Sequence, residues 1–287
     1  MKKIFSFLPV LFLLLACDDS NTDSTEEMIT LENCDGIVAD NVPDFYKSYF
    51  SCVDVSMSGS NVIIFTEGEP PYQSWYYPQD HPNYIEYVSK GTQYFKNPNL
   101  IAAKQHQISI PPTPVSRNLT INNAMIDGIP NTNNNEYHMG LAGIALNGVA
   151  IFNPLAAPGH DIEEEKYSFD YYNAHPTPDG SYHYHTATQG PLEVLQDKGL
   201  ITNASIRPAE VELYGIMCDG TVILGCTELN GSVPNNSGFD AQNGHVHDIQ
   251  NKSGKIHFTN RYHTHLCPDT FSYHKFTPEI QYYEGCN

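Results

Sequence analysis

The chain has few basic residues. It contains 14 Lys and Arg residues against 33 Asp and Glu, and its formal charge is −19 with the histidines neutral. Removing Lys2 and Lys3 with an N-terminal leader would take away two positive charges and leave −21 (−19 − 2). An acidic chain is repelled by nucleic-acid backbones and by anionic lipid surfaces. We therefore expect no nucleic-acid partner, and the sequence indicates no particular protein partner.

Several familiar catalytic signatures are also absent. The chain has no Gly-rich phosphate loop, no His-Glu-x-x-His helix and no Gly-x-Ser-x-Gly elbow. Segments with helical periodicity are scarce. These absences exclude the common nucleotide-binding, zinc-peptidase and serine-hydrolase patterns.

No second long apolar run follows the one at the N-terminus. Lys2 and Lys3 precede an apolar stretch at 5–15, which is too short for a stable transmembrane span and indicates an export signal over residues 1–16. Its end, LLAC at 14–17, resembles a bacterial lipobox, which implies cleavage before Cys17 and lipidation of that residue. An ordinary signal peptide and an uncut anchor are the alternatives. We expect a protein exported to the periplasmic or cell-surface side of a bacterial membrane and attached to it through lipid alone.

The segment after Cys17 has almost nothing to bury. Residues 17–33 are acidic and polar, so we expect a flexible tether. About 250 residues remain, enough for one large domain, which we place at 34–287.

Six cysteines remain when the lipidated one is set aside. An even number in an exported chain indicates disulfides, although many pairings are possible. Neighbours in sequence are expected to pair, as Cys34–Cys52, Cys218–Cys226 and Cys267–Cys286. In the alternative, Cys267 is a soft metal ligand, because it lies two residues after His265.

Short alternating or β-branched runs, separated by Gly, Pro and Asn clusters, predict a mainly β fold with few short helices. Asn147-Gly148 and Asp219-Gly220 are typical of tight hairpin turns, which require positive φ angles. The expected elements are strands at 62–65, 107–110 and 119–121, hairpins at 143–152 and 214–224, and helices at 83–90 and 191–199.

The second half of the chain contains an internal repeat. The first copy reads GIALNGVAIFNP and then FDYYNAHPTPDGSYHYH; the second reads GIMCDGTVILGC and then FDAQNGHVHDIQNKSGKIHFTNRYHTH. The turns and the Asn-x-His segments align, and the second copy carries an insertion before its last histidines. We expect a compact β-rich domain built from two pseudo-repeated halves, at about 140–200 and 211–275, facing each other.

The YHYH string at 182–185, the twin FDxxNxH segments and the hairpin before each resemble the bacterial YHYH-domain proteins. The resemblance covers roughly residues 51–286. In the second copy the tetrapeptide is YHTH, at 262–265, and Ala174 stands where glycine is usual in the first. Neither change removes a histidine. The family brings no settled activity, so the resemblance implies a fold and a site more than a function.

Three His-x-His pairs suggest a metal site. An extended strand points residues i and i+2 to the same face, so each pair presents two imidazoles together, and neutral imidazoles bind transition metals. The turn sequence PTPDG can bring a further histidine against the first pair. Seven rings exceed the coordination of one ion, so either each half holds a site, which the repeat slightly favours, or both contribute to one. The candidate ligands are His175, His183, His185, His245, His247, His263 and His265.

Other polar residues of the repeat could support the histidines. Tyr182 and Tyr262 should lie on the opposite strand face, with their hydroxyls finding partners. Asp170 and Asp240 could be ligands or could orient a histidine by accepting its other N–H. Alternatively, the Asp and Asn of FDxxN cap local turns, which we favour for the asparagines.

The remaining histidines carry less information. A lone histidine is more often a hydrogen-bonded core group, which we expect for His81, His106, His160 and His274. His138 and His257 lie near the repeat segments and are intermediate.

All-imidazole ligation suits copper, zinc, nickel or iron, and we expect copper or zinc as the cofactor. The leading hypothesis is a lipid-anchored protein that stores or handles this metal. A metal-dependent hydrolase or copper oxidase of the cell envelope is the alternative, so enzymatic activity stays open. A third hypothesis is that the protein is an adhesion or glycan-binding module in which the histidines are structural. The aromatic stretch at 72–77 could then stack on sugars, although such stretches are more often core.

Overall fold

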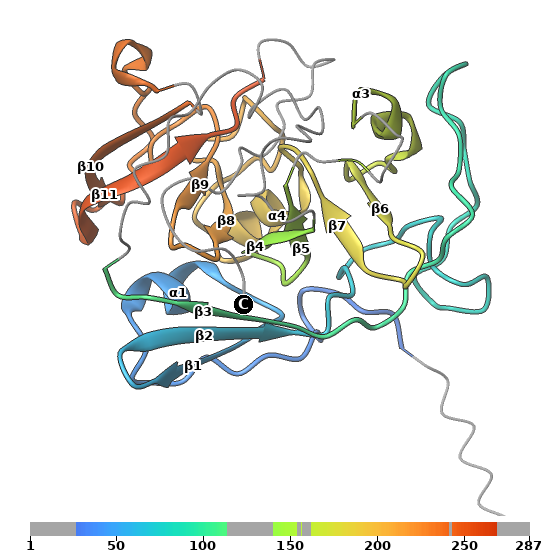
Figure 1. The fold of residues 1–287 in the computed structure, drawn as a ribbon, viewed down its shortest axis with the longest axis horizontal. Coiled ribbons are helices and arrows are strands. Elements are labelled where there is room, and N and C mark those ends of the chain that lie inside the picture. The colour runs from blue at the N-terminus through green and yellow to red at the C-terminus, as the bar shows by residue number, and fades with distance from the viewer. Residues whose placement is uncertain (1–26, 114–139, 154–155, 157–161, 241–242, 269–287) are drawn as a thin grey trace, which may run out of the picture.

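The computed structural model describes residues 27–113, 140–153, 156, 162–240 and 243–268. The signal segment, Cys17, the strand expected at 119–121, Cys286 and three histidines, His138, His160 and His274, lie outside them. The described part is mainly β, as predicted, with a three-stranded sheet and an eight-stranded sheet (Figure 1).

The small sheet is antiparallel and has the order β1-β2-β3. Its strands are β1 (Asp54–Ser58), β2 (Asn61–Thr66) and β3 (His106–Ile110). Alternate residues of β2 are buried, as the period of a half-buried strand requires. A short helix, α1 (Asp44–Tyr49), lies beside this sheet and was not predicted. The strands expected at 62–65 and 107–110 are confirmed.

The large sheet has the order β10-β11-β9-β8-β4-β5-β7-β6. Its strands in chain order are β4 (Leu141–Ala145), β5 (Ala150–Phe152), β6 (Ala174–Pro176), β7 (Tyr182–Tyr184), β8 (Leu213–Met217), β9 (Val222–Leu224), β10 (Gly244–Gln250) and β11 (Ile256–His265).

Pairing on the two sides of this sheet follows the same sequence of steps. β4 and β8 pair antiparallel at the centre, with Ile144 opposite Ile216. On one side, β4 forms an antiparallel hairpin with β5, β5 pairs parallel with β7, and β7 pairs antiparallel with β6. On the other side, β8 forms an antiparallel hairpin with β9, β9 pairs parallel with β11, and β11 pairs antiparallel with β10. The histidine-rich strands therefore form the two opposite outer edges of the sheet (Figure 1).

Glycine is required at the turns and at the centre of this sheet. The predicted hairpins are confirmed, with Gly148 at φ 80° and Gly220 at φ 84° in their turns. At the central pair, a Cβ on Gly215 would lie 2.3 Å from the carbonyl oxygen of Ile144. The two middle strands can approach each other only because this side chain is absent.

The helix predicted at 191–199 is confirmed as α4 (Gly190–Asp197), which packs against β8 and is followed by Gly199 at φ 69°. The helix predicted at 83–90 is wrong. There Ser74 N–H donates to Asn83 O and Ile85 N–H donates to Ser74 O, so an extended bridge satisfies these groups. The other helical turns are α3 (Ile162–Glu165), η1 (Lys166–Ser168) and η2 (Asn236–Gly238).

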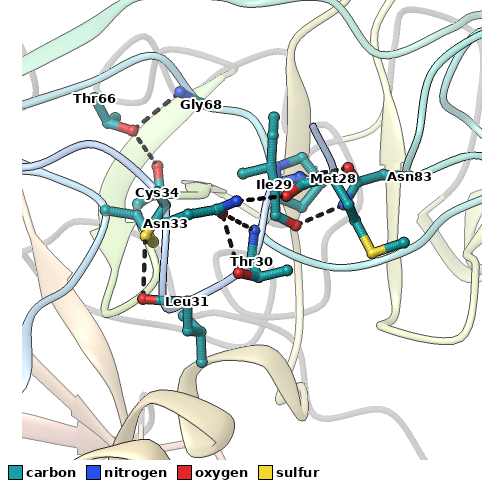
Figure 2. The surroundings of a disulfide bond; sticks show 12 residues. Met28, Ile29, Thr30, Leu31, Asn33, Cys34, Thr66, Gly68 and Asn83 are labelled. Atoms are coloured by element: carbon teal, nitrogen blue, oxygen red, sulfur yellow. Dashed lines mark hydrogen bonds between the residues drawn. A yellow bond between two sulfur atoms is a disulfide. The ribbon is translucent and has the colours of Figure 1, made fainter. Parts of the chain in front are cut away.

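The N-terminal described residues are attached to the domain, although they fall within the expected tether. The amide of Ile29 donates to Asn83 Oδ1 at 2.7 Å, and Asn83 Nδ2 donates to Ile29 O at 2.7 Å (Figure 2). The predicted Cys34–Cys52 disulfide follows directly and is confirmed. The ordered domain therefore begins before residue 34.

The other predicted disulfide pairs are wrong. Cys226 bonds to Cys267 across 41 residues, and Cys218 is also disulfide-bonded. The parallel pairing of β9 with β11 brings the ends of these strands together, and with them Cys226 and Cys267. Cys267 is consequently not a thiolate metal ligand. Disulfides favour an exported protein.

The aromatic stretch that could have been a sugar platform is part of the core. Tyr72, Trp75, Tyr76 and Tyr77 are all buried, so their faces are not open to a glycan. Across the part of the chain that the structure describes, we find no helix with the length and apolar character needed for a membrane span.

Candidate metal centres

The first histidine cluster lies at the edge of the large sheet formed by β6 and β7. His175 on β6 pairs directly with His183 on β7, and His185 follows two residues later on the same face. One potential ligand atom from each ring lies within 4.8 Å of the others. The PTPDG turn thus brings His175 to the pair, as expected.

Backbone carbonyls determine which ring nitrogens are free. His183 Nδ1 lies 3.0 Å from Ser181 O, and His185 Nδ1 lies 2.7 Å from Asn153 O. A carbonyl only accepts, so both Nδ1 atoms carry the proton and both Nε2 atoms of the neutral rings carry lone pairs. These two Nε2 atoms lie 3.0 Å apart. In a tetrahedral zinc site two imidazole nitrogens would be about 3.3 Å apart, so the spacing is close to that of shared ligation.

The third ring is held in the same tautomer by a serine. Ser168 Oγ donates to Glu165 O at 2.8 Å and lies 2.6 Å from His175 Nδ1. Since the hydroxyl proton is used on the carbonyl, the hydroxyl accepts the Nδ1 proton of His175. The Nε2 of His175 is then also a lone-pair donor.

Burial keeps these rings neutral. It lowers the pKa of His175 and His183 well below the ordinary value, with neighbouring histidines as a further cause, and it lowers the pKa of His185 to about 4. Neutral imidazole is the form that binds a metal ion.

The second cluster lies at the opposite edge, on β10 and β11. His245 pairs with His263 across the two strands, and a carboxylate that the sequence did not reveal, Glu228, lies among the rings. Glu228 Oε1 is 3.2 Å from Nε2 of His245, 3.2 Å from Nε2 of His247 and 3.5 Å from Nε2 of His265. Its Oε2 is 3.3 Å from Nε2 of His263.

Three ring nitrogens of this cluster lack hydrogen bonds. Among the described residues, Nε2 of His245, His263 and His265 is buried without a hydrogen-bond partner. His263 Nδ1 lies 3.0 Å from Arg261 O, and His265 Nδ1 lies 2.8 Å from Gly225 O, so their Nδ1 atoms are again the protonated ones. Buried polar atoms are normally satisfied, so three convergent exceptions call for an explanation.

The carboxylate and the rings of the second cluster shift each other's pKa. Burial raises the pKa of Glu228, but His263 and His265 lower it by more, so the pKa lies far below its usual value. Burial lowers the pKa of His245 to about 4 and also lowers that of His263. The close ligand group consists of Glu228, His245, His247 and His263, and His265 lies beside it, 3.5 Å from Glu228.

The phenylalanine of each FDxxNxH segment packs on the rings. Phe169 stacks on His185, with ring planes 12° apart and centroids 5.9 Å apart. Phe239 stacks on His265, at 18° and 5.0 Å. Each phenylalanine also meets the first histidine of its cluster edge-on. These contacts restrict the rotation of the imidazoles.

The aspartates of these segments have a different role from histidine orientation. Asp170 accepts from Tyr182 Oη at 2.6 Å and from the amide of Tyr172 at 2.9 Å. Asp240 accepts from Tyr262 Oη at 2.9 Å and from the amide of Gly244 at 3.0 Å. They therefore cap turns and pair with the tyrosines on the opposite strand face.

The asparagines of the same segments occupy the turns, as favoured. Asn173 and Asn243 have φ angles of 55° and 57°, the left-handed region that asparagine tolerates better than most residues.

A cavity of about 700 Å³ opens onto the first cluster. Besides the three ligand candidates it is lined by Phe95, Phe152, Pro98, Pro176 and His106. His106 was expected to be an unrelated core histidine; its Nε2 lies 2.9 Å from Ser181 Oγ at the wall of this cavity. Two other single histidines are half-buried and contact tyrosines: His81 stacks on Tyr77, and His257 lies 3.2 Å from Tyr49 Oη.

Glu228 could not be identified from the sequence because it belongs to no histidine segment. It lies two residues after Cys226, and only the pairing of β9 with β11 brings this loop to the rings. The sequence also left open whether one ion or two would be held. The structure has two separate groups, at opposite edges of one sheet.

Comparison with known proteins agrees with this histidine frame. Residues 123–231 match the model of the family described as "YHYH protein". This segment, which is less than half of the chain, is similar to the YHYH family. The match contains the whole first cluster and ends between Glu228 and the histidines of the second. No curated protein and no solved structure gave a significant match.

Proposed function

We propose that this protein binds transition-metal ions at two centres, one at each edge of its large sheet. The observation that carries the proposal is the convergence of buried Nε2 atoms, with those of His183 and His185 3.0 Å apart and three more at 3.2–3.5 Å from Glu228 without a well-aligned hydrogen bond. The lone pairs of facing ring nitrogens repel each other, and a cation bound between the rings would accept these lone pairs as ligands.

Purely structural histidines explain this arrangement less well. A neutral ring whose Nδ1 proton is used on a carbonyl can only accept at Nε2, so two such rings cannot hydrogen-bond to each other. Protonating one ring would supply a hydrogen bond, but burial lowers the pKa of His183 and of His185. Without an ion, each cluster would leave buried acceptors facing each other.

Imidazole ligands in this number suit copper or zinc, so metal storage or handling is the proposed role. The first centre has three nitrogen ligands and a position facing the cavity, whereas the second can surround an ion with Glu228 and several rings. Open sites exchange ligands more readily than closed ones. The first centre is therefore the one proposed to accept and release metal.

One observation favours a second candidate, a metal-dependent enzyme of the cell envelope. The cavity of about 700 Å³ over the first cluster is within the size range of small-molecule sites. A metal with an open position beside such a cavity could activate water or a bound substrate.

The lipobox-like end of the leader and the disulfides support a location outside the cytoplasm, with attachment to a membrane through Cys17.

Metal content tests the proposal. Purified protein should hold about two equivalents of copper or zinc by elemental analysis, one per histidine cluster. His183→Ala plus His185→Ala should remove one equivalent and leave a folded domain. His81→Ala, which changes a histidine outside both clusters, is the matched control and should retain both. Two equivalents in the double variant would exclude the first centre, and none in the unaltered protein would exclude both.

A further inference from the structure

We propose that the first centre takes a small organic carboxylate with an apolar body from the cavity, as the ligand that completes the coordination of its metal. This inference rests on the proposed metal-binding function. It follows from a difference in charge between the two centres, whose His-x-His pairs make the same kind of carbonyl contact.

The second histidine of each pair makes the same kind of carbonyl contact in the two centres. His185 Nδ1 donates to Asn153 O after β5, and His265 Nδ1 donates to Gly225 O after β9. Three residues further along, the second half has Glu228 and the first has Ala156. Ala156 is 3% exposed and belongs to the same buried cluster as Phe169, whose ring stacks on His185. By this offset in sequence, the first half has a methyl group at the position where the second half has its carboxylate.

Charge balance then requires an anion from outside. Three neutral imidazoles leave both charges of a divalent ion uncompensated in a buried site, which is unfavourable. Of the cavity's acidic residues, Asp179 is paired with Lys104 at 2.6 Å. Glu165 lines the cavity, but within the described ranges only the three histidines make up the close ligand group. Among the described residues none replaces Glu228 in the close ligand group of the first centre, so we infer that a ligand from the cavity supplies this negative charge.

Apolar side chains in the wall of the cavity favour an anion that has an apolar body. Phe152 stacks on His183 with centroids 3.9 Å apart, and Phe95 lines the cavity with 51% of its surface exposed. Pro98, Pro176 and Pro178 add further apolar surface. An apolar body attached to the carboxylate would cover these side chains and gain free energy from their burial.

Cobalt(II) substitution provides the test, because its visible absorption reports a change of ligand directly. The protein is loaded with two equivalents of Co(II) and titrated with benzoate and with acetate. Benzoate should change the spectrum and bind at least about tenfold more tightly than acetate, because its ring buries apolar area. His183→Ala plus His185→Ala should abolish the response although the second centre keeps its Co(II).

The cavity wall gives a matched variant. Phe95→Ala removes a half-exposed ring, so the fold should be retained, and the preference for benzoate over acetate should fall by about threefold to tenfold. Val88→Ala, which shortens an exposed apolar residue outside the cavity lining, is the control. Co(II) bound at the first centre without any response to benzoate, or with equal responses to the two anions, would overturn this inference and leave metal binding intact. Failure to bind Co(II) at all would overturn both.

The second centre supplies the reciprocal test. Glu228→Ala removes its internal carboxylate, so that centre should gain a spectral response to acetate, while the exposed Glu164→Ala should produce none. If Glu228→Ala binds Co(II) but ignores acetate, charge balance does not explain the difference between the centres.

Discussion

At the scale of single residues, the chemistry of each centre depends on which nitrogen of each ring bears the proton. Carbonyl oxygens hold His183 and His185 in one tautomer, and Ser168 does the same for His175. The strand period alone predicted that the rings share a face. It did not predict their tautomers, because the carbonyl that orients His185 belongs to a residue 32 positions away.

Ser168→Ala should weaken metal binding at the first centre without changing its stoichiometry. The hydroxyl accepts the Nδ1 proton of His175, and loss of such a partner typically costs about tenfold to a hundredfold in metal affinity. Competition with a chelator of known affinity measures the change. Ser89→Ala, at an exposed hydroxyl, is the control. An unchanged affinity for Ser168→Ala would show that this contact does not orient a ligand.

Asp219 makes stability depend on pH through its burial. Burial raises its pKa to about 6 from 3.8, so the folded state binds the proton more tightly than the unfolded chain. Its contribution to the free energy of unfolding is therefore largest below about pH 4 and is lost as the pH rises through about 6. Asn147, at the equivalent turn position, shows that an amide fits this type of turn.

Asp219→Asn cannot ionise and can still accept from the Thr221 amide. Relative to the unaltered protein, it should gain about 2 kcal/mol in free energy of unfolding between pH 4 and pH 7. Urea titrations at both pH values measure the gain, with the exposed Asp197→Asn as the control. A constant difference between Asp219→Asn and the unaltered protein would mean that the carboxyl is not the source of the dependence.

At the scale of elements, the large sheet depends on close contact between its two central strands. Both hairpin turns were predictable, since Asn-Gly and Asp-Gly supply the positive φ angles. The central contact was not, because nothing in either hairpin states that β4 and β8 pair. The helix expected at 83–90 failed for a similar reason: long-range hydrogen bonds to Ser74 outweighed its local pattern.

Gly215→Ala should destabilise the domain by about 3 kcal/mol or more, because the new methyl group would lie 2.3 Å from a backbone oxygen that cannot move aside. Gly199→Ala is the comparison: no atom lies within 4 Å of its Cβ position, and only its φ of 69° is unfavourable, which costs about 1 kcal/mol. Chemical denaturation of both variants measures the contrast. Equal losses would refute the close approach of β4 and β8.

At the scale of the whole molecule, disulfides tie the metal-bearing edges to the rest of the chain. Cys226–Cys267 joins the loop that carries Glu228 to the end of β11, two residues after His265. Cys34–Cys52 fixes the N-terminal segment that holds Asn83 (Figure 2). The Cys226–Cys267 bond thus adjoins the second centre, whereas Cys34–Cys52 joins segments that carry none of the candidate ligands.

Cys226→Ser plus Cys267→Ser should lower the free energy of unfolding by about 4 kcal/mol, since a long loop is released in the unfolded chain. It should also weaken metal binding at the second centre more than at the first, because the Glu228 loop loses its attachment. Denaturation and metal titration measure the two effects. Cys34→Ser plus Cys52→Ser is the control for disulfide loss alone, and equal metal affinities in the two variants would contradict the coupling.

The sequence by itself determined the features that depend on near neighbours. Strand period placed the histidines of each pair on one face, turn residues set the hairpins, and the short loop between Cys34 and Cys52 made their pairing the natural one. The similarity of residues 123–231 to the YHYH family was recognised from the same segments.

Only the tertiary structure decided how distant segments meet. It paired Cys226 with Cys267 and brought Glu228 among the second set of rings. These outcomes depend on which strands pair across the sheet, a choice made by the packing of the whole core that no local pattern encodes.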